Sequence, residues 1–487
     1  MNDQSRVTRI VMVVFDGLRP DVVTPDRMPA LSAFLGEARR YTRASSVFPS
    51  ITRVCASAIG TGAPSAVHGI VQNAFPDRAV RGDRLLDTAR PDDLRAAVAA
   101  HGPGFVATPR FADALAAAGK RLAIVHTGSA GGAFLLDPRA QANGSWVFSV
   151  HGRAATETPA AWDSAVARLG PPPAKSLPQA DMMDYGARVL TEVALPEAQP
   201  DIAVLWLNEP DTSFHYLGLD GPGTRAALAA SDAAFARVLE AVRAAPDGGA
   251  QTAVLAVSDH GHIAVTERLP LAEHLGEAGF GVALGTLHDD LTVYPGTACC
   301  FWQREPDAAR LQRLVAFLRE QPWCGPLFTL GGNGVEGAVP GSFDLALLGA
   351  AHPHAPAVVA QLRSSEAPDP YGLPGVSLIA GTDLPLGGGM HGGLNRAEMA
   401  NLIALRLPGR AAGETEARPV SLIDLAPTML GLLGLPPLPS MVGHDMLGAP
   451  AARPERLLET GAGQYRQALH LFGEGPAAVL HRAWRNA

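Results

Sequence analysis

The chain has 487 residues, of which 47% are hydrophobic and 18% are charged, so it can bury a large core and lacks the composition of a disordered protein. Its formal charge of −8 argues against a general nucleic-acid binder, because such proteins usually carry a surplus of basic residues. The four cysteines form no CxxC pair and no disulfide framework, which is typical of a reducing compartment.

Several short apolar runs follow one another along the chain, and each is followed by polar or glycine residues. They occupy residues 9–17, 120–128, 201–211 and 252–262. Their apolar residues are consecutive rather than alternating, which indicates parallel strands that are covered on both faces. Helix-like stretches lie between and after them, at residues 107–119, 180–195, 223–245 and 307–320. The pattern predicts an α/β fold with a doubly wound, mainly parallel sheet.

Residues 265–380 differ from their surroundings, because they are rich in proline and glycine, show weak periodicity and contain three of the four cysteines. We predict that they form an inserted, smaller α+β subdomain, or cap. The core would then consist of residues 1–264 and 381–487.

The N-terminal apolar run is too short for the hydrophobic region of a signal peptide, because it extends only from Ile10 to Phe15 and ends at Asp16. No stretch approaches the about 18 uninterrupted apolar residues of a transmembrane helix. We therefore expect a soluble, cytoplasmic protein that binds neither a membrane nor nucleic acid. The sequence leaves the oligomeric state open, with a homodimer as one option.

Four stretches place oxygen or imidazole ligands after apolar runs. They are VVFDG with Asp16, NEPDTSFH with Asp211 and His215, SDHGH with Asp259 and His260, and GMHGG with His391. In a doubly wound sheet, functional groups gather at the carboxyl ends of the strands. Taken alone, each stretch has an ordinary explanation, such as a helix cap for Asp16. Together they predict a metal site, because zinc and similar ions take carboxylates and imidazoles in sets of three or four.

These motifs resemble those of the alkaline phosphatase superfamily, specifically its nucleotide pyrophosphatase/phosphodiesterase (type I phosphodiesterase) branch. That branch includes the related phosphonoacetate hydrolases. The resembling stretches are VVFDGLRPD, FPSIT…GTGAPSAVHGIVQN, NEPDTSFHYLG, SDHGH, MHGGLN and DLAPTMLGLLGL. They run from residue 10 to about residue 435 in the family's order. The resemblance implies an alkaline-phosphatase-like catalytic core and a small phosphorylated or phosphonate substrate.

The resemblance also implies two divalent metal ions, Zn²⁺ first, with Mn²⁺ or Fe as alternatives. The residues that match the ligands of one ion are Asp211, His215 and His391. Those that match the ligands of the other ion are Asp16, Asp259 and His260, together with Thr52.

Thr52 lies two residues after FPS and matches the family's nucleophile, and Asn73 in HGIVQN matches an asparagine that holds a phosphoryl oxygen. A threonine hydroxyl needs a metal or a base to become a good nucleophile, which agrees with a metal site beside it. We expect hydrolysis of phosphate diesters or phosphonate esters through a phosphothreonine intermediate. Cys55 is not expected to be a sulfatase-type nucleophile, because Ile59 replaces the arginine four residues after it.

Arg53 follows the nucleophile, where nucleotide-cleaving members usually carry an aromatic residue that stacks on the base. Its guanidinium could clamp a carboxylate or second phosphate, or instead point to solvent or pair with an acid, and both readings stay open. Two further candidates near the substrate are Lys120, one of only two lysines, and His262 in SDHGH, which could orient a metal ligand or donate to a leaving group. His352 and His354 are expected on a loop of the cap.

Two alternatives remain at this stage. The same site could cleave C–P bonds of phosphonoacetate-like substrates, with Lys120 or Arg53 holding the carboxylate. The chain could also be a non-catalytic protein that binds a phosphorylated ligand. The presence of the whole ligand set and of Thr52 argues against this second alternative.

Overall fold

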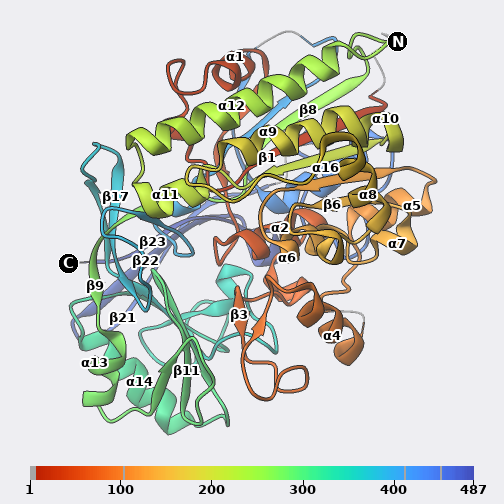
Figure 1. The fold of residues 1–487 in the computed structure, drawn as a ribbon. Coiled ribbons are helices and arrows are strands. Elements are labelled where there is room, and N and C mark those ends of the chain that lie inside the picture. The colour runs from red at the N-terminus through yellow and green to blue at the C-terminus, as the bar shows by residue number, and fades with distance from the viewer. Residues whose placement is uncertain (1–6, 103–104, 411–412, 450–451, 487) are drawn as a thin grey trace.

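The centre of the molecule is an eight-stranded, mainly parallel sheet (Figure 1). The structure is a computed structural model that describes residues 7–102, 105–410, 413–449 and 452–486. In order across the sheet, the strands are β20 (Thr415–Ser421), β2 (Arg39–Ser45), β19 (Ile403–Arg406), β8 (Thr252–Ser258), β1 (Arg9–Phe15), β7 (Ile202–Leu207), β5 (Leu122–His126) and β6 (Trp146–Ser149). β1 pairs in parallel with β7 and β8, whereas β19 runs antiparallel to β8 and β2.

The central strand β1 is buried on both faces, as its uninterrupted apolar sequence predicts. Side chains alternate across a strand, so Ile10, Met12 and Val14 enter one hydrophobic cluster and Val11 and Val13 enter the other. Each face of the sheet therefore has its own core.

Helices cover both faces of the sheet, which confirms the predicted doubly wound α/β fold. On one face pack α1 (Pro29–Glu37), α9 (Ala180–Arg188) and α12 (Pro222–Arg243). On the other pack α2 (Thr52–Thr61), α5 (Phe111–Ala117), α6 (Ala130–Leu136) and α16 (Leu425–Leu432). Within the part of the chain that the structure describes, no helix has the length and apolarity that crossing a membrane requires.

A second, six-stranded sheet lies within the segment predicted as the cap and forms the lower left of Figure 1. Its order is β10 (Val282–Leu284), β11 (Leu291–Tyr294), β12 (Ala298–Gln303), β15 (Val358–Leu362), β13 (Cys324–Thr329) and β14 (Phe343–Asp344). Two helices, α13 (Leu271–Glu277) and α14 (Ala308–Glu320), contribute to a hydrophobic cluster with this sheet.

A four-stranded sheet connects the cap segment to the core. Its order is β16 (Ser364–Pro368), β17 (Pro374–Ala380), β9 (Ile263–Leu269) and β18 (Gly389–Met390). The boundary predicted after residue 264 falls inside β9, and the boundary predicted after residue 380 falls at the end of β17. A C-terminal sheet of β21 (Glu455–Ala462), β22 (Tyr465–Phe472) and β23 (Val479–Arg485) also reaches the cap segment, because the Tyr465 hydroxyl donates to the Gly325 carbonyl at 2.7 Å.

Candidate active site

The candidate site lies at the carboxyl ends of three neighbouring strands, β7, β1 and β8. Asp16 follows β1, Asp211 begins α11 (Asp211–Leu217) shortly after β7, and Asp259 follows β8. His391 arrives from the four-stranded sheet, directly after β18. Parallel pairing of these strands brings their ends to one edge, so Asp211 and Asp259 lie beside Asp16 although they are 195 and 243 positions after it in the sequence.

The first group of side chains surrounds Asp16. One ligand atom from each of Asp16, Asp259 and His260 lies within 4.8 Å of the others. The His260 Nε2 atom lies 3.3 Å from Asp259 Oδ2 and 3.6 Å from Asp16 Oδ1. The Thr52 Oγ1 atom lies 3.4 Å from both Asp16 Oδ1 and His260 Nε2. The hydroxyl of the predicted nucleophile is thus next to this group.

The second group surrounds Asp211 and has four members, because His262 joins His215 and His391. The Asp211 Oδ1 atom lies 3.1 Å from His262 Nε2 and 3.4 Å from the Nε2 atoms of His215 and His391. The two groups are adjacent, since the His260 and His391 rings stack with centroids 3.7 Å apart.

Backbone carbonyls fix the tautomer of all four histidines. Each Nδ1 donates to a carbonyl oxygen: His215 to Gly389 at 2.7 Å, His391 to Ser50 at 2.9 Å, His262 to Gly17 at 3.0 Å and His260 to Gly261 at 3.1 Å. In the neutral rings, each Nε2 therefore presents a lone pair to the site. This arrangement orients a metal-ligating histidine and makes its free nitrogen more basic.

Buried polar atoms in both groups have close neighbours but no hydrogen-bond partner within the described structure: Asp211 Oδ1, Asp259 Oδ2 and His262 Nε2. Burial, with the nearby charge of Asp211, raises the pKa of Asp259 to about 8 despite backbone hydrogen bonds that oppose the shift. Burial and the charges of Asp259 and Asp211 likewise raise the pKa of Asp16 well above its usual range. Two buried carboxylates, Asp16 and Asp259, and the half-buried Asp211 are costly to hold together without cations, so this donor set fits two divalent ions.

The two groups open to a hollow of about 240 Å³. Its walls include Asp16, Thr52, Arg53, Lys175, Asn208 and Asp211. Thr52 is the first residue of α2, so the unpaired N–H groups of the first helical turn lie beside its hydroxyl. A helix N-terminus carries a partial positive charge that stabilises a bound anion.

Arg53 lies in the wall of this hollow, next to Thr52. Its Nε donates to Thr88 Oγ1 at 3.0 Å and its NH1 group to Ser129 Oγ at 3.4 Å. Both partners are neutral hydroxyl groups, so neither forms an ion pair with the guanidinium, although the carboxylates of Asp87, Asp16 and Asp211 are close enough to act on its charge.

Asn73 is linked to the same wall, because its backbone carbonyl accepts from Thr88 Oγ1 at 2.7 Å. Its buried Oδ1 atom lacks a hydrogen-bond partner in the described structure. The side chain interacts with Tyr294, which comes from strand β11 of the cap segment and whose pKa burial raises.

Lys120 is not brought to the site, in contrast to the prediction that it contacts the substrate. It precedes β5, and its Nζ pairs with Asp201 Oδ1 at 2.9 Å just before β7. Both positions lie at the amino ends of the strands, the edge of the sheet opposite Asp16. The lysine that lines the hollow is instead Lys175, together with His151. Lys175 ends the irregular stretch PPPAK, so no periodicity in the sequence could have placed it.

Cys55 is buried in α2, with its Sγ atom 3.3 Å from Ser46 Oγ. Burial raises the pKa of this thiol well above its usual value, which agrees with the prediction that it is not a nucleophile. Ser50 has a positioning role: its hydroxyl donates to the Gly393 carbonyl at 3.0 Å and accepts from the Gly392 N–H at 3.1 Å. These bonds hold the loop that carries His391.

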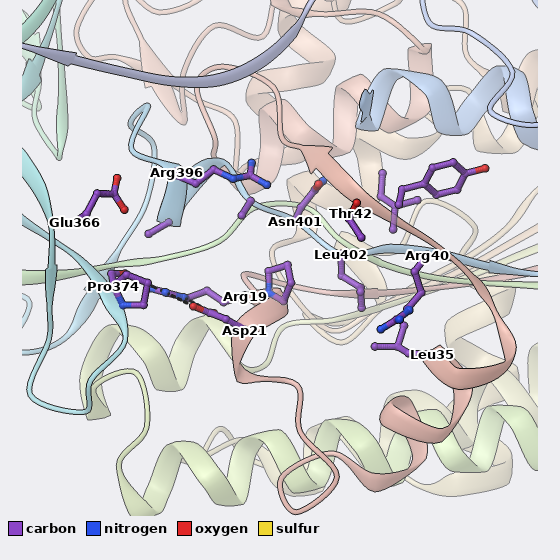
Figure 2. Close-up of a pocket in the computed structure, with 15 residues that line it drawn as sticks. Arg19, Asp21, Leu35, Arg40, Thr42, Glu366, Pro374, Arg396, Asn401 and Leu402 are labelled. Atoms are coloured by element: carbon purple, nitrogen blue, oxygen red, sulfur yellow. Dashed lines mark hydrogen bonds and ion pairs between the residues drawn. The ribbon is translucent and has the colours of Figure 1, made fainter. Parts of the chain in front are cut away.

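A larger hollow, of about 300 Å³, lies elsewhere (Figure 2). Arg19, Arg40, Arg396 and Glu366 are among the residues that line it, and it contains none of the predicted site residues. Arg19 reaches from it toward the candidate site, since its NH1 group donates to the His262 carbonyl at 2.9 Å.

Residues 10–314 match the family model described as type I phosphodiesterase / nucleotide pyrophosphatase, which covers more than half of the chain. The chain belongs to this family. Membership places the protein among phosphodiesterase and nucleotide pyrophosphatase hydrolases, as the motifs predict. The predicted relation to the phosphonoacetate hydrolases stays a prediction.

The solved structures that share the fold of this phosphodiesterase family member include the following three. Murine ectonucleotide pyrophosphatase/phosphodiesterase 5 is 14% identical with a TM-score of 0.61, and the match covers 88% of this chain and 96% of that chain. The human protein of the same name gives the same values. An inactive variant of the murine protein in complex with AMP is 15% identical with a TM-score of 0.60, covering 89% and 96%. No curated protein sequence matches the chain.

Proposed function

We propose that the protein is a two-metal phosphodiesterase that hydrolyses phosphate diesters or phosphonate esters through a phosphothreonine on Thr52. The observation that carries this proposal is the position of the Thr52 hydroxyl, 3.4 Å from ligand atoms of both Asp16 and His260, at the N-terminus of α2. Family membership supports the reaction class.

The two groups of side chains would hold the two ions. One ion would be bound by Asp16, Asp259, His260 and Thr52, and the other by Asp211, His215, His262 and His391. His262 enters this set because its Nδ1 donates to a carbonyl and its Nε2 faces Asp211, as in the predicted ligands. Divalent ions such as Zn²⁺, when bound, lower the pKa of a coordinated hydroxyl and offset charge on phosphoryl oxygens.

The reaction would proceed in two displacements at phosphorus. In the first, the Thr52 Oγ attacks, the bond to the leaving-group oxygen breaks, and that oxygen departs with the electron pair and gains a proton. In the second, a water oxygen attacks the phosphothreonine, and the Oγ–P bond breaks to restore the hydroxyl. The N–H groups of α2, the Asn73 amide and the Arg53 guanidinium would hold the negative phosphoryl oxygens during both steps.

The cations around the hollow favour a substrate with a second anionic group. Arg53 faces neutral partners, and Lys175 lines the same hollow. A bidentate guanidinium and a nearby ammonium suit a carboxylate or a second phosphate better than a neutral base. This observation also favours the second candidate function, cleavage of the C–P bond in phosphonoacetate-like substrates, in which the carbon leaving group takes up a proton.

A substrate panel on zinc-loaded protein tests both functions. It would contain a nitrophenyl diester, a nitrophenyl phosphonate ester, a nitrophenyl monoester, a dinucleotide and phosphonoacetate. We expect fast hydrolysis of the first two, loss of activity in Thr52→Ala, and partial activity in Thr52→Ser, which keeps a hydroxyl. Thr266→Ala, at an exposed position in β9, is the matched control.

The outcomes separate the proposals. Faster turnover of phosphonoacetate than of the diester would assign the C–P hydrolase function. Full diesterase activity in Thr52→Ala would exclude Thr52 as the nucleophile. No turnover of any substrate by protein that binds two zinc ions would favour a non-catalytic phospho-ligand-binding protein.

A further inference from the structure

A third cluster of metal-type ligands lies outside the candidate active site, where the cap segment meets the core. Asp77 follows the short strand β3 (Ala74–Phe75), His101 is the last residue of α4 (Pro91–His101), and His354 lies in the loop before β15. One ligand atom from each of the three lies within 4.8 Å of the others. The three residues come from separate segments, so their convergence is a property of the fold and not of local sequence.

Both imidazoles converge on the same oxygen of Asp77. The His101 Nε2 atom lies 2.7 Å from Asp77 Oδ2, and the His354 Nε2 atom lies 3.4 Å from it. Asp77 is buried, whereas the side chains of His101 and His354 are 26% and 17% exposed. The Phe105 ring packs against both imidazoles, with centroids 5.3 Å from His101 and 4.5 Å from His354. The cluster therefore has an apolar side and an opening to solvent.

The hydrogen bonds of His352 determine which nitrogen of His354 carries a proton. The backbone N–H of His354 donates to His352 Nδ1 at 3.1 Å, so that nitrogen holds a lone pair. The His354 Nδ1 atom lies 3.3 Å from the same acceptor, where only a protonated Nδ1 is favourable.

A neutral His354 with its proton on Nδ1 would present the lone pair of Nε2 to Asp77 and His101, as a metal-ligating histidine does. An ion between the two rings and the carboxylate would then be bound by all three side chains.

We infer that Asp77, His101 and His354 form a further metal site, which binds a divalent transition ion such as Zn²⁺. Two imidazoles and one carboxylate are a common zinc donor set, and the exposed side leaves a fourth position for water. A metal ion accounts for the convergence of two Nε2 atoms from separate segments on one carboxylate oxygen.

The position of this site gives it a structural role. His354 belongs to the cap segment, whereas Asp77 and His101 belong to the segment that also carries Asn73. An ion shared by these residues would hold the cap against the core near the contact between Tyr294 and Asn73. Binding to the folded state alone would also stabilise the protein by mass action.

Metal content tests the inference. Protein dialysed against buffered Zn²⁺ would be analysed by inductively coupled plasma mass spectrometry as wild type, His101→Gln, His354→Gln and the control His274→Gln, which lies in α13 of the same cap segment. We expect His101→Gln and His354→Gln each to bind one zinc ion fewer per chain than wild type and to keep the wild-type turnover of the diester at saturating zinc. His274→Gln should match wild type in both measurements.

Equal zinc content in wild type and both cluster variants would overturn the inference and assign the contact as a protonated histidine paired with Asp77. Because the experiment compares the zinc content of variants with that of wild type, its result does not depend on whether the active-site groups bind two ions. If the variants do not fold, anomalous diffraction at the zinc edge from wild-type crystals replaces them. A peak between the three side chains would support the site, and its absence in zinc-soaked crystals would refute it.

Discussion

The Trp206 side chain offers a sharp test of how the site is positioned. Its indole Nε1 donates to Asp16 Oδ2 at 2.9 Å, and the ring is fully buried and stacked on His126 with centroids 5.1 Å apart. Trp206→Phe removes the donor and keeps an aromatic ring in the core. A hydrogen bond to a charged group contributes about 1.5–3 kcal/mol, which corresponds to a factor of about 10 to 150 in an equilibrium constant.

We expect the loss of this hydrogen bond to weaken metal binding. Burial and the charges of Asp259 and Asp211 raise the pKa of Asp16, and the Trp206 hydrogen bond opposes them. Without the donor, the carboxylate is less favoured in its ionised form and less fixed in orientation. The zinc concentration that gives half-maximal diesterase activity should therefore rise by about 10- to 150-fold, with activity recovering in part at saturating zinc.

The assay is a zinc titration of chelator-treated protein, with the nitrophenyl diester as substrate and circular dichroism as a check on folding. Trp323→Phe is the control, because Trp323 is also buried and lies in the cap segment, outside the active site and outside the Asp77 cluster. An unchanged zinc requirement in folded Trp206→Phe would refute the idea that this bond positions Asp16 for metal binding.

Three further predictions follow from the site. His262→Gln should lower the affinity for one zinc ion by at least about 100-fold, and a loss of 10-fold or less in a zinc titration would mean that His262 only orients its neighbours. EDTA should abolish activity and added Zn²⁺ should restore it; full activity of protein shown to be metal-free would exclude the two-metal proposal. Burial raises the pKa of Glu398 to about 7, so the folded protein favours the protonated carboxyl. The contribution of this group to the free energy of unfolding is therefore complete below about pH 4.5 and is lost as the pH rises through about 7. Glu398→Gln should remove that part of the pH dependence of Tm. An unchanged slope of Tm against pH would contradict the raised pKa of Glu398.

The core of the fold and the convergence of the candidate ligand groups were predictable because their signals are local. Strand β1 is an uninterrupted apolar run that ends at Asp16, and the same pattern precedes Asp259. Parallel pairing then brings such strand ends together without further information from the sequence.

The rest of the site depends on contacts between distant segments. Tyr294 reaches Asn73 from the cap segment, and the lysine that lines the hollow is Lys175, from an irregular stretch, and not Lys120. His262 lies beside SDHG in the sequence, but it resembles the other candidate ligands because its Nδ1 donates to a backbone carbonyl. That carbonyl belongs to Gly17, 245 positions away. Strand β9 crosses the predicted boundary of the cap because its partners, β17 and β18, lie more than a hundred residues later.

The pairing of β9 with β18 has a consequence for how such a chain can change. β9 begins one residue after His262, β18 ends one residue before His391, and Met390 pairs with Ile263 across the ladder. The chain therefore leaves for the cap and returns from it at the same place, directly beside the candidate ligands. Residues of the cap segment outside β17, which itself pairs with β9, can be lengthened, shortened or exchanged without shifting the register that sets His262 against His391. Much of the cap segment can therefore vary while the candidate ligands stay in place.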